Sequence, residues 1–255
     1  MPAADPVLEL TGCTITAAEA DGRVCVREVN WTVAAGERWG ICGPVGSGKT
    51  HLLEVAAGLR APAAGQVRLL GRDPATLRGP ALAALRRAVA LVYGRGGRLF
   101  GHLTLAQNVA LPLCYHRNCS IEAAVEETGR LLAAFGLEAL AARLPGQVNP
   151  AWQQRAALAR ALILRPAVLF LDHPLEWLND AHARWWREFL GGAEIGWPCP
   201  ATVVVTSEDA QPWRLPGWRW AHIRDTAWTV EAPARPAEPP PPPAREGLAP
   251  GALPG

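Results

Sequence analysis

The hydrophobic pattern of this chain changes from alternation to continuous apolar runs along its length. Residues 7–16 and 22–33 alternate between apolar and polar side chains, which predicts strands of a small antiparallel lobe. Residues 39–42, 167–172 and 201–206 are apolar almost throughout. Such runs are typical of strands that are buried on both faces of a parallel sheet. We therefore expect two kinds of strand in one fold.

Helical patterning separates these strands. It covers residues 81–87 and 121–142, and it predicts a helix over 52–59 that ends near Gly58. A further helix is expected over 152–165, because the proline at 166 disfavours helical backbone in the residue before it. Strands that alternate with helices indicate an α/β fold with an open layered sheet.

Composition narrows the class of protein. The 255 residues are 49% hydrophobic, enough for one sizeable core or a core with a smaller lobe. A formal net charge of +2 gives no electrostatic reason to expect a nucleic-acid partner. No stretch approaches the roughly 18 apolar residues that a membrane helix needs, and the first ten residues lack the pattern of a secretory signal. We expect a cytoplasmic protein.

Cysteine and tryptophan usage add little chemistry. None of the six cysteines forms a CxxC pair or has zinc-ligand spacing, so we interpret them as small apolar residues in a reducing compartment. Of the adjacent Trp185 and Trp186, at least one is expected in the core. Trp213, Trp218 and Trp220 are expected to pack against a sheet edge, and an interface patch is the alternative.

The C-terminal end differs from the rest of the chain. From residue 231 prolines dominate, with five in a row, and bulky apolar residues are sparse. Such a segment cannot form a core, so we expect a folded domain over residues 1–232 and a disordered or polyproline II tail over 233–255. A docking role for the tail is the alternative.

One motif carries strong chemical information. Residues 43–50 read GPVGSGKT and match the Walker A pattern G-x-x-x-x-G-K-[ST], between an expected strand and an expected helix. Glycines allow successive main-chain N–H groups to face one anion, and the helix N-terminus adds its positive end. The motif contains Lys49, the single lysine among 25 basic residues. A slim ammonium fits a tight backbone loop where a planar guanidinium does not.

The motif therefore predicts a site for MgATP in a P-loop NTPase core. Lys49 is expected to reach the β- and γ-phosphates, while the Thr50 hydroxyl and Asp172, at the end of the apolar run 167–172, are expected to hold magnesium. The expected nucleotide-binding residues are Gly43, Pro44, Val45, Gly46, Ser47, Gly48, Lys49, Thr50 and His51.

Four segments together resemble the ATP-binding subunits of ABC transporters. AVLFLDHP (167–174) is similar to their Walker B strand, and LPGQVNPAWQQRAALARALILRP (144–166) to their signature region and following helix. LVYGRGGRLFGHLTLAQNVALPL (91–113) resembles their Q-loop and the start of their helical subdomain, and TVVVTSED (202–209) the strand of their switch histidine. The resemblance covers about residues 7–230.

The resemblance implies a complete architecture and a set of partners. It implies a mostly parallel sheet, a small antiparallel β lobe, and an inserted α-helical subdomain over about residues 95–160. It also implies transmembrane permease subunits and a second ATP-binding subunit, in a homo- or heterodimer, at the inner face of the cell membrane. Residues 102–113 further resemble subunits of bacterial lipid importers of the MCE-associated type.

Several positions depart from the family pattern where hydrolysis is concerned. His173 occupies the position of the catalytic glutamate, Gly94 that of the Q-loop glutamine, and Ser207 that of the switch histidine. A neutral His173 is a candidate base, and a tolerated substitution is the alternative. Arg98, near the Q-loop position, is interpreted as a surface residue, with phosphate contact as the alternative. Residues 14–20 lack the aromatic ring on which the family stacks adenine.

The groups that the family supplies across a dimer are also replaced. The signature aligns with VNPAW (148–152), where Asn149 stands at the serine position. Pro150 has no N–H to donate, and Trp152 is far larger than the glutamine of the family. Asn179 occupies the position of the D-loop aspartate. This segment is expected to be a poor clamp for a partner's nucleotide.

Phosphate- and magnesium-binding groups thus remain while groups specific to the hydrolytic transition state are replaced, and the two functions are separable. We expect an ABC-transporter subunit that binds ATP and Mg²⁺ with weak or absent intrinsic hydrolysis. One alternative is a non-hydrolysing structural or regulatory subunit that pairs with a competent ATPase. Another is an unrelated P-loop enzyme such as a small-molecule kinase.

Overall fold

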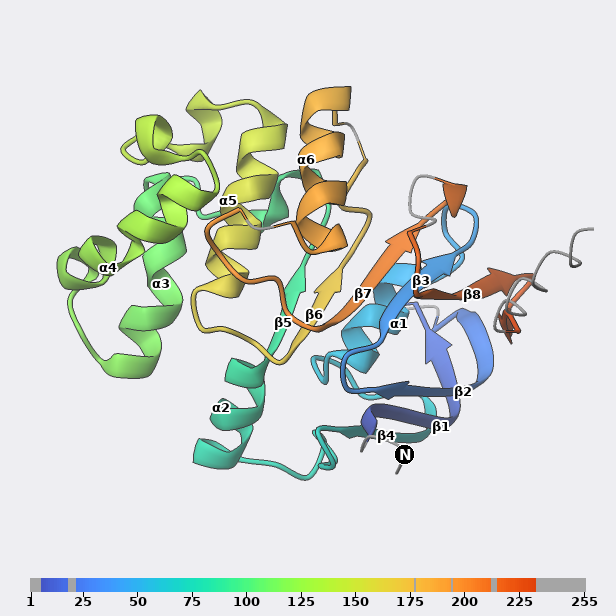
Figure 1. Cartoon of the computed structure of the whole chain (residues 1–255). Helices are drawn as coiled ribbons and strands as arrows, with labels where there is room; N and C mark the ends of the chain where they lie inside the picture. The colour runs from blue at the N-terminus through green and yellow to red at the C-terminus, as the bar shows by residue number, and fades with distance from the viewer. Residues whose placement is uncertain (1–5, 18–21, 177, 194, 212–214, 233–255) are drawn as a thin grey trace, which may run out of the picture.

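Both kinds of expected strand belong to one sheet. The structure is a computed structural model that describes residues 6–17, 22–176, 178–193, 195–211 and 215–232. The described strands form a nine-stranded sheet in the order β4-β1-β2-β9-β8-β3-β7-β6-β5 (Figure 1). Their bounds are β1 Pro6–Thr16, β2 Val24–Ala34, β3 Arg38–Cys42, β4 Ala64–Leu69, β5 Val89–Val92, β6 Val168–Leu171, β7 Thr202–Ser207, β8 Trp218–Arg224 and β9 Ala227–Val230.

The α/β class is confirmed by the pairing within this sheet. β8, β3, β7, β6 and β5 are parallel neighbours, whereas β4, β1 and β2 form an antiparallel lobe and β9 pairs antiparallel with β8. Strand β6 is buried on both faces, as its apolar run predicted. Phe170 packs into a core with the β1–β2 lobe, while Leu169 and Leu171 pack into a second core on the side of the helices.

Six α-helices lie among the described residues, on the two sides of the parallel strands. They are α1 Lys49–Ala56, α2 Gly79–Ala88, α3 Leu105–Arg117, α4 Ile121–Ala134, α5 Pro150–Leu162 and α6 Asp180–Gly191. Helix α1 lies between the parallel strands and the antiparallel lobe, and α3, α4, α5 and α6 gather at the other side (Figure 1). Short 3₁₀ turns occupy η1 Arg95–Arg98, η2 Glu138–Leu140 and η3 Pro145–Gln147.

All four expected helices differ from the structure at their ends. The helix expected over 52–59 spans Lys49–Ala56, and the one expected over 81–87 spans Gly79–Ala88. The pattern over 121–142 gives one helix only as far as Ala134, because Gly136 adopts φ 67° and ends it. The helix expected over 152–165 begins earlier, at Pro150, and ends at Leu162. Proline is well suited to the first helical turn, where its missing N–H has no intrahelical acceptor.

Three of the tryptophans that the sequence analysis singled out are core residues. Trp186 is fully buried, which confirms the prediction for the 185–186 pair. Trp218 and Trp220 are buried on β8, which lies inside the sheet rather than at its edge. A Cβ atom at Gly40 of β3 would lie 2.1 Å from the Trp220 ring, so the glycine allows that ring to cross the neighbouring strand. Trp213 and the tail 233–255 lie outside the described residues.

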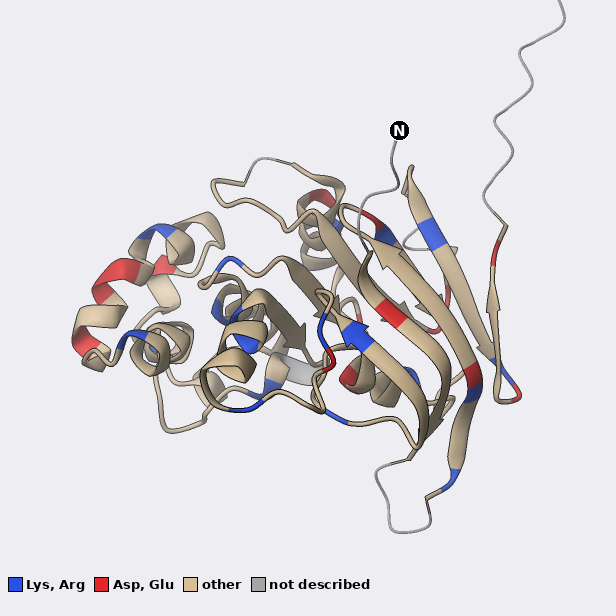
Figure 2. Ribbon diagram, turned by 90° about the horizontal axis from the view of Figure 1, so that it is seen from below, with Lys and Arg blue, Asp and Glu red and all other residues tan. Residues whose placement is uncertain are grey.

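Charged residues of both signs are distributed over the fold, and the carboxylates of α4 stand out at one end (Figure 2). Among the residues that the structure describes, no helix is both long and apolar enough to span a bilayer. None of the six cysteines, all of which lie within the described residues, forms a disulfide.

Candidate nucleotide-binding site

The phosphate loop (residues 43–50) connects β3 to α1, as the sequence predicted. Gly46 and Gly48 adopt φ 76° and 91°, backbone that L-residues with a side chain rarely adopt. A Cβ atom at Gly48 would also lie 2.4 Å from Cβ of Cys25 on β2, so glycine is required there for two reasons. The loop therefore curls tightly against the antiparallel lobe and places the start of α1 at the carboxyl end of the parallel strands.

Lys49 lies inside this loop rather than on the surface. Its side chain is buried, and its ammonium donates to the carbonyl oxygens of Gly43 at 2.6 Å and Pro44 at 2.8 Å. Burial lowers the pKa of Lys49, while the negative charges of Glu208 and Asp172 oppose that shift. An ammonium held by neutral carbonyls beside carboxylates can be attracted strongly by a phosphate anion.

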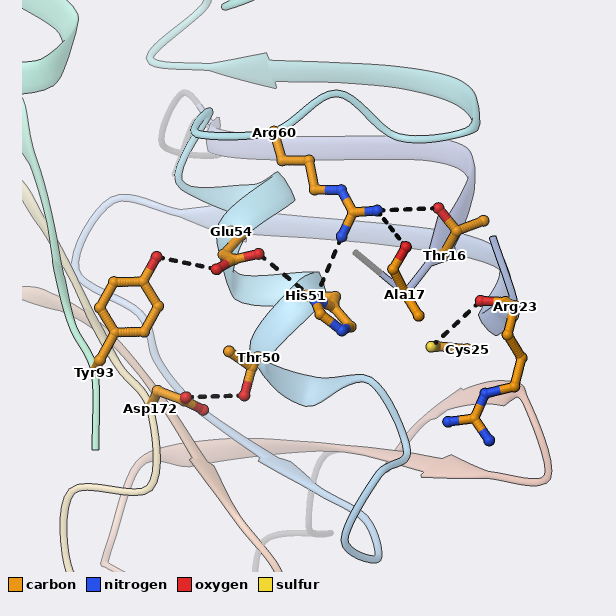
Figure 3. Close-up of polar contacts among 10 residues, drawn as sticks. All are labelled: Thr16, Ala17, Arg23, Cys25, Thr50, His51, Glu54, Arg60, Tyr93 and Asp172. Atoms are coloured by element: carbon orange, nitrogen blue, oxygen red, sulfur yellow. Dashed lines mark hydrogen bonds and ion pairs between the residues drawn. The ribbon is translucent and has the colours of Figure 1, made fainter. Parts of the chain in front are cut away.

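The two expected magnesium ligands are adjacent. Thr50 Oγ1 donates to Asp172 Oδ2 at 2.9 Å, so the start of α1 and the end of β6 meet (Figure 3). The other carboxylate oxygen accepts from Thr206 Oγ1 at 2.8 Å, and Thr206 Oγ1 also accepts from His173 N at 3.0 Å. A hydroxyl and a carboxylate are the hard oxygen ligands that Mg²⁺ prefers, so these residues fit the ion.

Thr206 was not singled out in the sequence. It lies at the end of the apolar run 201–206, and the carboxyl ends of parallel strands meet at one edge of a sheet. The position of Thr206 at the end of this run is the sequence signal from which its place near Asp172 could have been predicted. The hydroxyl now holds one carboxylate oxygen in place, which leaves the other beside Thr50.

A cavity of about 550 Å³ opens beside the phosphate loop. The loop lines one side, and Tyr93, Gly94 and Arg98 line another. The Ser47 hydroxyl is buried and has no hydrogen-bond partner within the protein. A buried polar group of this kind is costly unless a ligand or water satisfies it. Ser47 is not among the residues that line the cavity, so the cradle for an anion is indicated by the backbone of Gly46 and Gly48, whose positive φ values let successive N–H groups face one point.

His173 lines the same cavity at the position expected of the water-activating residue. Its backbone has φ 46°, a conformation that is uncommon for residues with a side chain. Burial lowers the pKa of His173; the nearby Asp172 opposes this shift and the Lys49 ammonium adds to it. The imidazole is therefore neutral at neutral pH, which leaves one ring nitrogen as an acceptor.

The Q-loop position is occupied by close packing rather than by a polar side chain. A Cβ atom at Gly94 would lie 3.0 Å from the carbonyl oxygen of Asp172. Arg98 is exposed, as expected of a surface arginine, yet it lines the cavity and its guanidinium lies 3.6 Å above the Tyr93 ring. Tyr93 itself, Glu176 and Glu208 line the cavity and were missed; Tyr93 and Glu208 lie in the Q-loop and switch segments, each next to the position that the family pattern marks.

The signature and D-loop positions have structural roles within this chain. The Asn149 side chain accepts from Trp152 N at 3.1 Å and caps α5, and Asn179 accepts from His182 N at 3.0 Å and caps α6. Trp152 packs edge-on against His182, with ring centroids 4.8 Å apart. Asparagine is favoured at such caps, so both substitutions preserve helix starts.

No aromatic side chain faces the cavity near the expected adenine position in the described part of the chain. Ala17, Arg23 and Cys25 line it there, and residues 18–21 lie outside the described residues. Any base in this part of the cavity meets a methyl group and a guanidinium rather than a stacked ring.

Comparisons with known proteins agree with this fold. Residues 26–176 match the ABC transporter family, so the chain belongs to that family. It is 39% identical over 190 residues to the methionine import ATP-binding protein MetN of Caulobacter vibrioides, covering 74% of this chain and 55% of that one. It is 34% identical over 177 residues to the lipoprotein-releasing system ATP-binding protein LolD of Chromohalobacter salexigens, covering 69% and 73%.

A solved structure has the same architecture. The dimeric ATP-binding cassette MJ0796, in a post-hydrolysis state bound to ADP and phosphate, matches with a TM-score of 0.73 and 28% identity over 88% of this chain and 97% of that one. The chain covers 39% of the spermidine/putrescine import protein PotA of Trichodesmium erythraeum and 55% of MetN, less than two thirds of either. Family membership excludes the small-molecule kinase interpretation.

Proposed function

We propose that this chain is the ATP-binding subunit of a membrane transporter and that its cavity binds MgATP with weak or absent intrinsic hydrolysis. The observation that carries the proposal is the meeting of Lys49, Thr50 and Asp172 at the mouth of one glycine-rich loop. In the proposed complex, N–H groups of residues 46–50 and the Lys49 ammonium bind phosphate oxygens. The Thr50 hydroxyl and Asp172 hold Mg²⁺, which screens the phosphate charge.

The remaining loop residues have supporting roles in this proposal. Gly43, Pro44 and Val45 form the first half of the loop, and the carbonyls of the first two position the Lys49 ammonium before nucleotide arrives. His51 lines the cavity directly after Thr50 and is proposed to contact the nucleotide there.

Slow turnover follows from what the cavity lacks. Removing a positioned general base costs about 10²–10⁴ in rate, and His173 stands where the family has its carboxylate. The neutral imidazole is the only candidate base at that position, and its hydrogen-bonding reach differs from that of a glutamate. Gly94 offers no side chain to orient water or metal. Binding is retained because the contacts with phosphate are made in the ground state as well as in the transition state.

The proposed partners follow from the relatives. Named relatives are ATP-binding proteins of import and lipoprotein-release systems, and the matched cassette is a dimer. We propose that this chain binds transmembrane permease subunits and a second ATP-binding subunit, as a homo- or heterodimer, at the inner face of the cell membrane. The resemblance of residues 102–113 to lipid-importer subunits supports a transporter of the MCE-associated type.

Equilibrium binding of labelled ATP to the purified chain, with and without Mg²⁺, tests the proposal. Wild type is expected to bind, and Lys49→Ala is expected to lose affinity by at least about tenfold, because a charge-assisted hydrogen bond is worth about 1.5–3 kcal/mol. Arg68→Ala is a matched control, because it removes one positive charge from an exposed position on β4. Equal binding by wild type and Lys49→Ala refutes the assignment.

A further inference from the structure

Side chains from two parts of the chain, α1 and the segment after β5, form a continuous row beside the cavity, which His51 and Tyr93 line. Figure 3 shows Tyr93 facing Glu54, with His51 on the other side of the same carboxylate. Tyr93 Oη donates to Glu54 Oε1 at 3.0 Å, and Glu54 Oε2 lies 3.5 Å from His51 Nδ1. His51 and Glu54 belong to α1, the helix that begins in the phosphate loop, and Tyr93 follows β5.

The Tyr93 end of the row is connected to the helical part of the molecule. The Tyr93 carbonyl accepts from Gln154 Nε2 of α5 at 3.2 Å. The Arg98 guanidinium covers the Tyr93 ring, and the Gly97 carbonyl beside it accepts from Arg160 Nη2 of α5 at 2.7 Å. A shift of Tyr93 therefore acts on both η1 and α5.

The His51 end is connected to the nucleotide side of the cavity. His51 lines the cavity directly after Thr50. Arg60 Nη1 lies 3.4 Å from His51 Nδ1, and Arg60 Nη2 donates to the Ala17 carbonyl at 2.7 Å. His51 and Glu54 lie one turn apart on α1, so a ligand that orders His51 acts on the helix that carries Glu54.

We propose that the Tyr93–Glu54 hydrogen bond is the positioning contact that transmits nucleotide binding from α1 to η1 and α5, in place of a side chain at Gly94. This inference rests on the proposed function, because it requires that the cavity holds nucleotide. The two partners are 39 positions apart and belong to different elements. Gly94 contributes only a backbone that packs against Asp172.

The chemistry of the pair suits a permanent link. Burial, assisted by the negative charge of Glu54, raises the pKa of Tyr93 to about 12. The phenol therefore stays protonated and remains a donor across the physiological pH range. A hydrogen bond from a neutral donor to a carboxylate is among the stronger ones in proteins. A contact that persists while its helix shifts can couple two sites.

Hydrogen exchange of the full-length chain, with and without saturating MgADP, tests the link, because it reports η1 and α5 separately from binding. Each variant is first titrated, so that exchange is compared at full occupancy. In wild type, nucleotide is expected to slow exchange in residues 95–98 and 150–162 by about fivefold or more, the lower end of typical coupling. In Tyr93→Phe and Glu54→Ala, that effect is expected to fall below about twofold.

The chain offers matched controls. Tyr115→Phe removes the hydroxyl of the other tyrosine, which is 80% exposed on α3, and is expected to behave as wild type. Glu54→Gln retains an acceptor oxygen for Tyr93 and is expected to keep the response. Loss of the response in Glu54→Ala alone then reports loss of the hydrogen bond rather than loss of folding. In the double variant Tyr93→Phe/Glu54→Ala, the effect of nucleotide on exchange is expected to be as large as in either single variant, because both substitutions remove the same contact.

The outcomes separate this inference from the proposed function. If wild type binds nucleotide but η1 and α5 do not respond, or if Tyr93→Phe responds fully, the link is overturned and nucleotide binding stands. If wild type binds no nucleotide, the proposed function itself is overturned, and the link with it.

Discussion

Replacing Gly48 by alanine separates two physical demands on the phosphate loop. Gly48 has φ 91°, and a Cβ atom there would lie 2.4 Å from Cβ of Cys25. The left-handed backbone alone costs a residue with a side chain about 1–2 kcal/mol. The steric conflict adds about 1–3 kcal/mol, since both atoms are fixed to the backbone and neither can rotate away. We expect Gly48→Ala to lower the free energy of unfolding by about 2–5 kcal/mol.

Gly46 supplies the matched comparison. It adopts φ 76°, but nothing lies within 4 Å of a Cβ built on it. Gly46→Ala therefore incurs the backbone cost of about 1–2 kcal/mol without the steric one. Urea unfolding without nucleotide measures both variants, with the slope m checked for constancy.

The double variant Cys25→Gly/Gly48→Ala isolates the contact. Removing Cβ of Cys25 takes away the atom that the new methyl group meets, so the two substitutions are expected to interact favourably by about 1–3 kcal/mol. Equal unfolding free energies for Gly46→Ala and Gly48→Ala, or strict additivity in the double variant, refute the steric argument.

Three further predictions address the rest of the molecule. Burial acts to raise the pKa of Glu37, but hydrogen bonds from Trp39, Ala34 and Arg219 outweigh it and lower the pKa below 4.5. Glu37→Gln is therefore expected to destabilise the protein at pH 7. The difference from wild type in urea unfolding is expected to vanish as the pH falls through the lowered pKa of Glu37. Trp186→Ala is expected to cost about 3–5 kcal/mol in the same assay, more than Trp185→Ala at a half-buried position, because it empties a core site. His173→Glu is expected to raise the ATPase rate, measured with the membrane subunits, by less than about 10², since Gly94 and Ser207 remain and catalytic groups act as a unit; a larger gain contradicts the view that several parts are missing.

The parts of the fold that follow a strong local pattern were predictable. The loop 43–50 and the strand that ends in Asp172 are set by glycine spacing and by a continuous apolar run, and the structure places them together. Strand β8 was missed because its alternation is carried by Trp218 and Trp220 between polar residues. Both tryptophans were interpreted as packing against a sheet edge rather than as part of a strand. Helix α3 has Pro112 inside it, which weakens its pattern.

The wall of the cavity was not predictable in the same way. The Tyr93–Glu54 contact joins residues 39 positions apart, and no motif relates one to the other. Such pairs depend on how β5 is placed beside α1, which is set by the packing of the whole sheet. Helix ends were also uncertain, since one glycine, Gly136, divided what the periodicity presented as a single helix.

A crystal structure of the chain grown with magnesium and a slowly hydrolysed ATP analogue tests the central claim most directly. The account predicts the β- and γ-phosphates against the main-chain N–H groups of residues 46–50, the Lys49 ammonium turned from its carbonyl partners to phosphate, and Mg²⁺ between Thr50 and Asp172. An empty loop at saturating nucleotide, or nucleotide bound elsewhere, contradicts it.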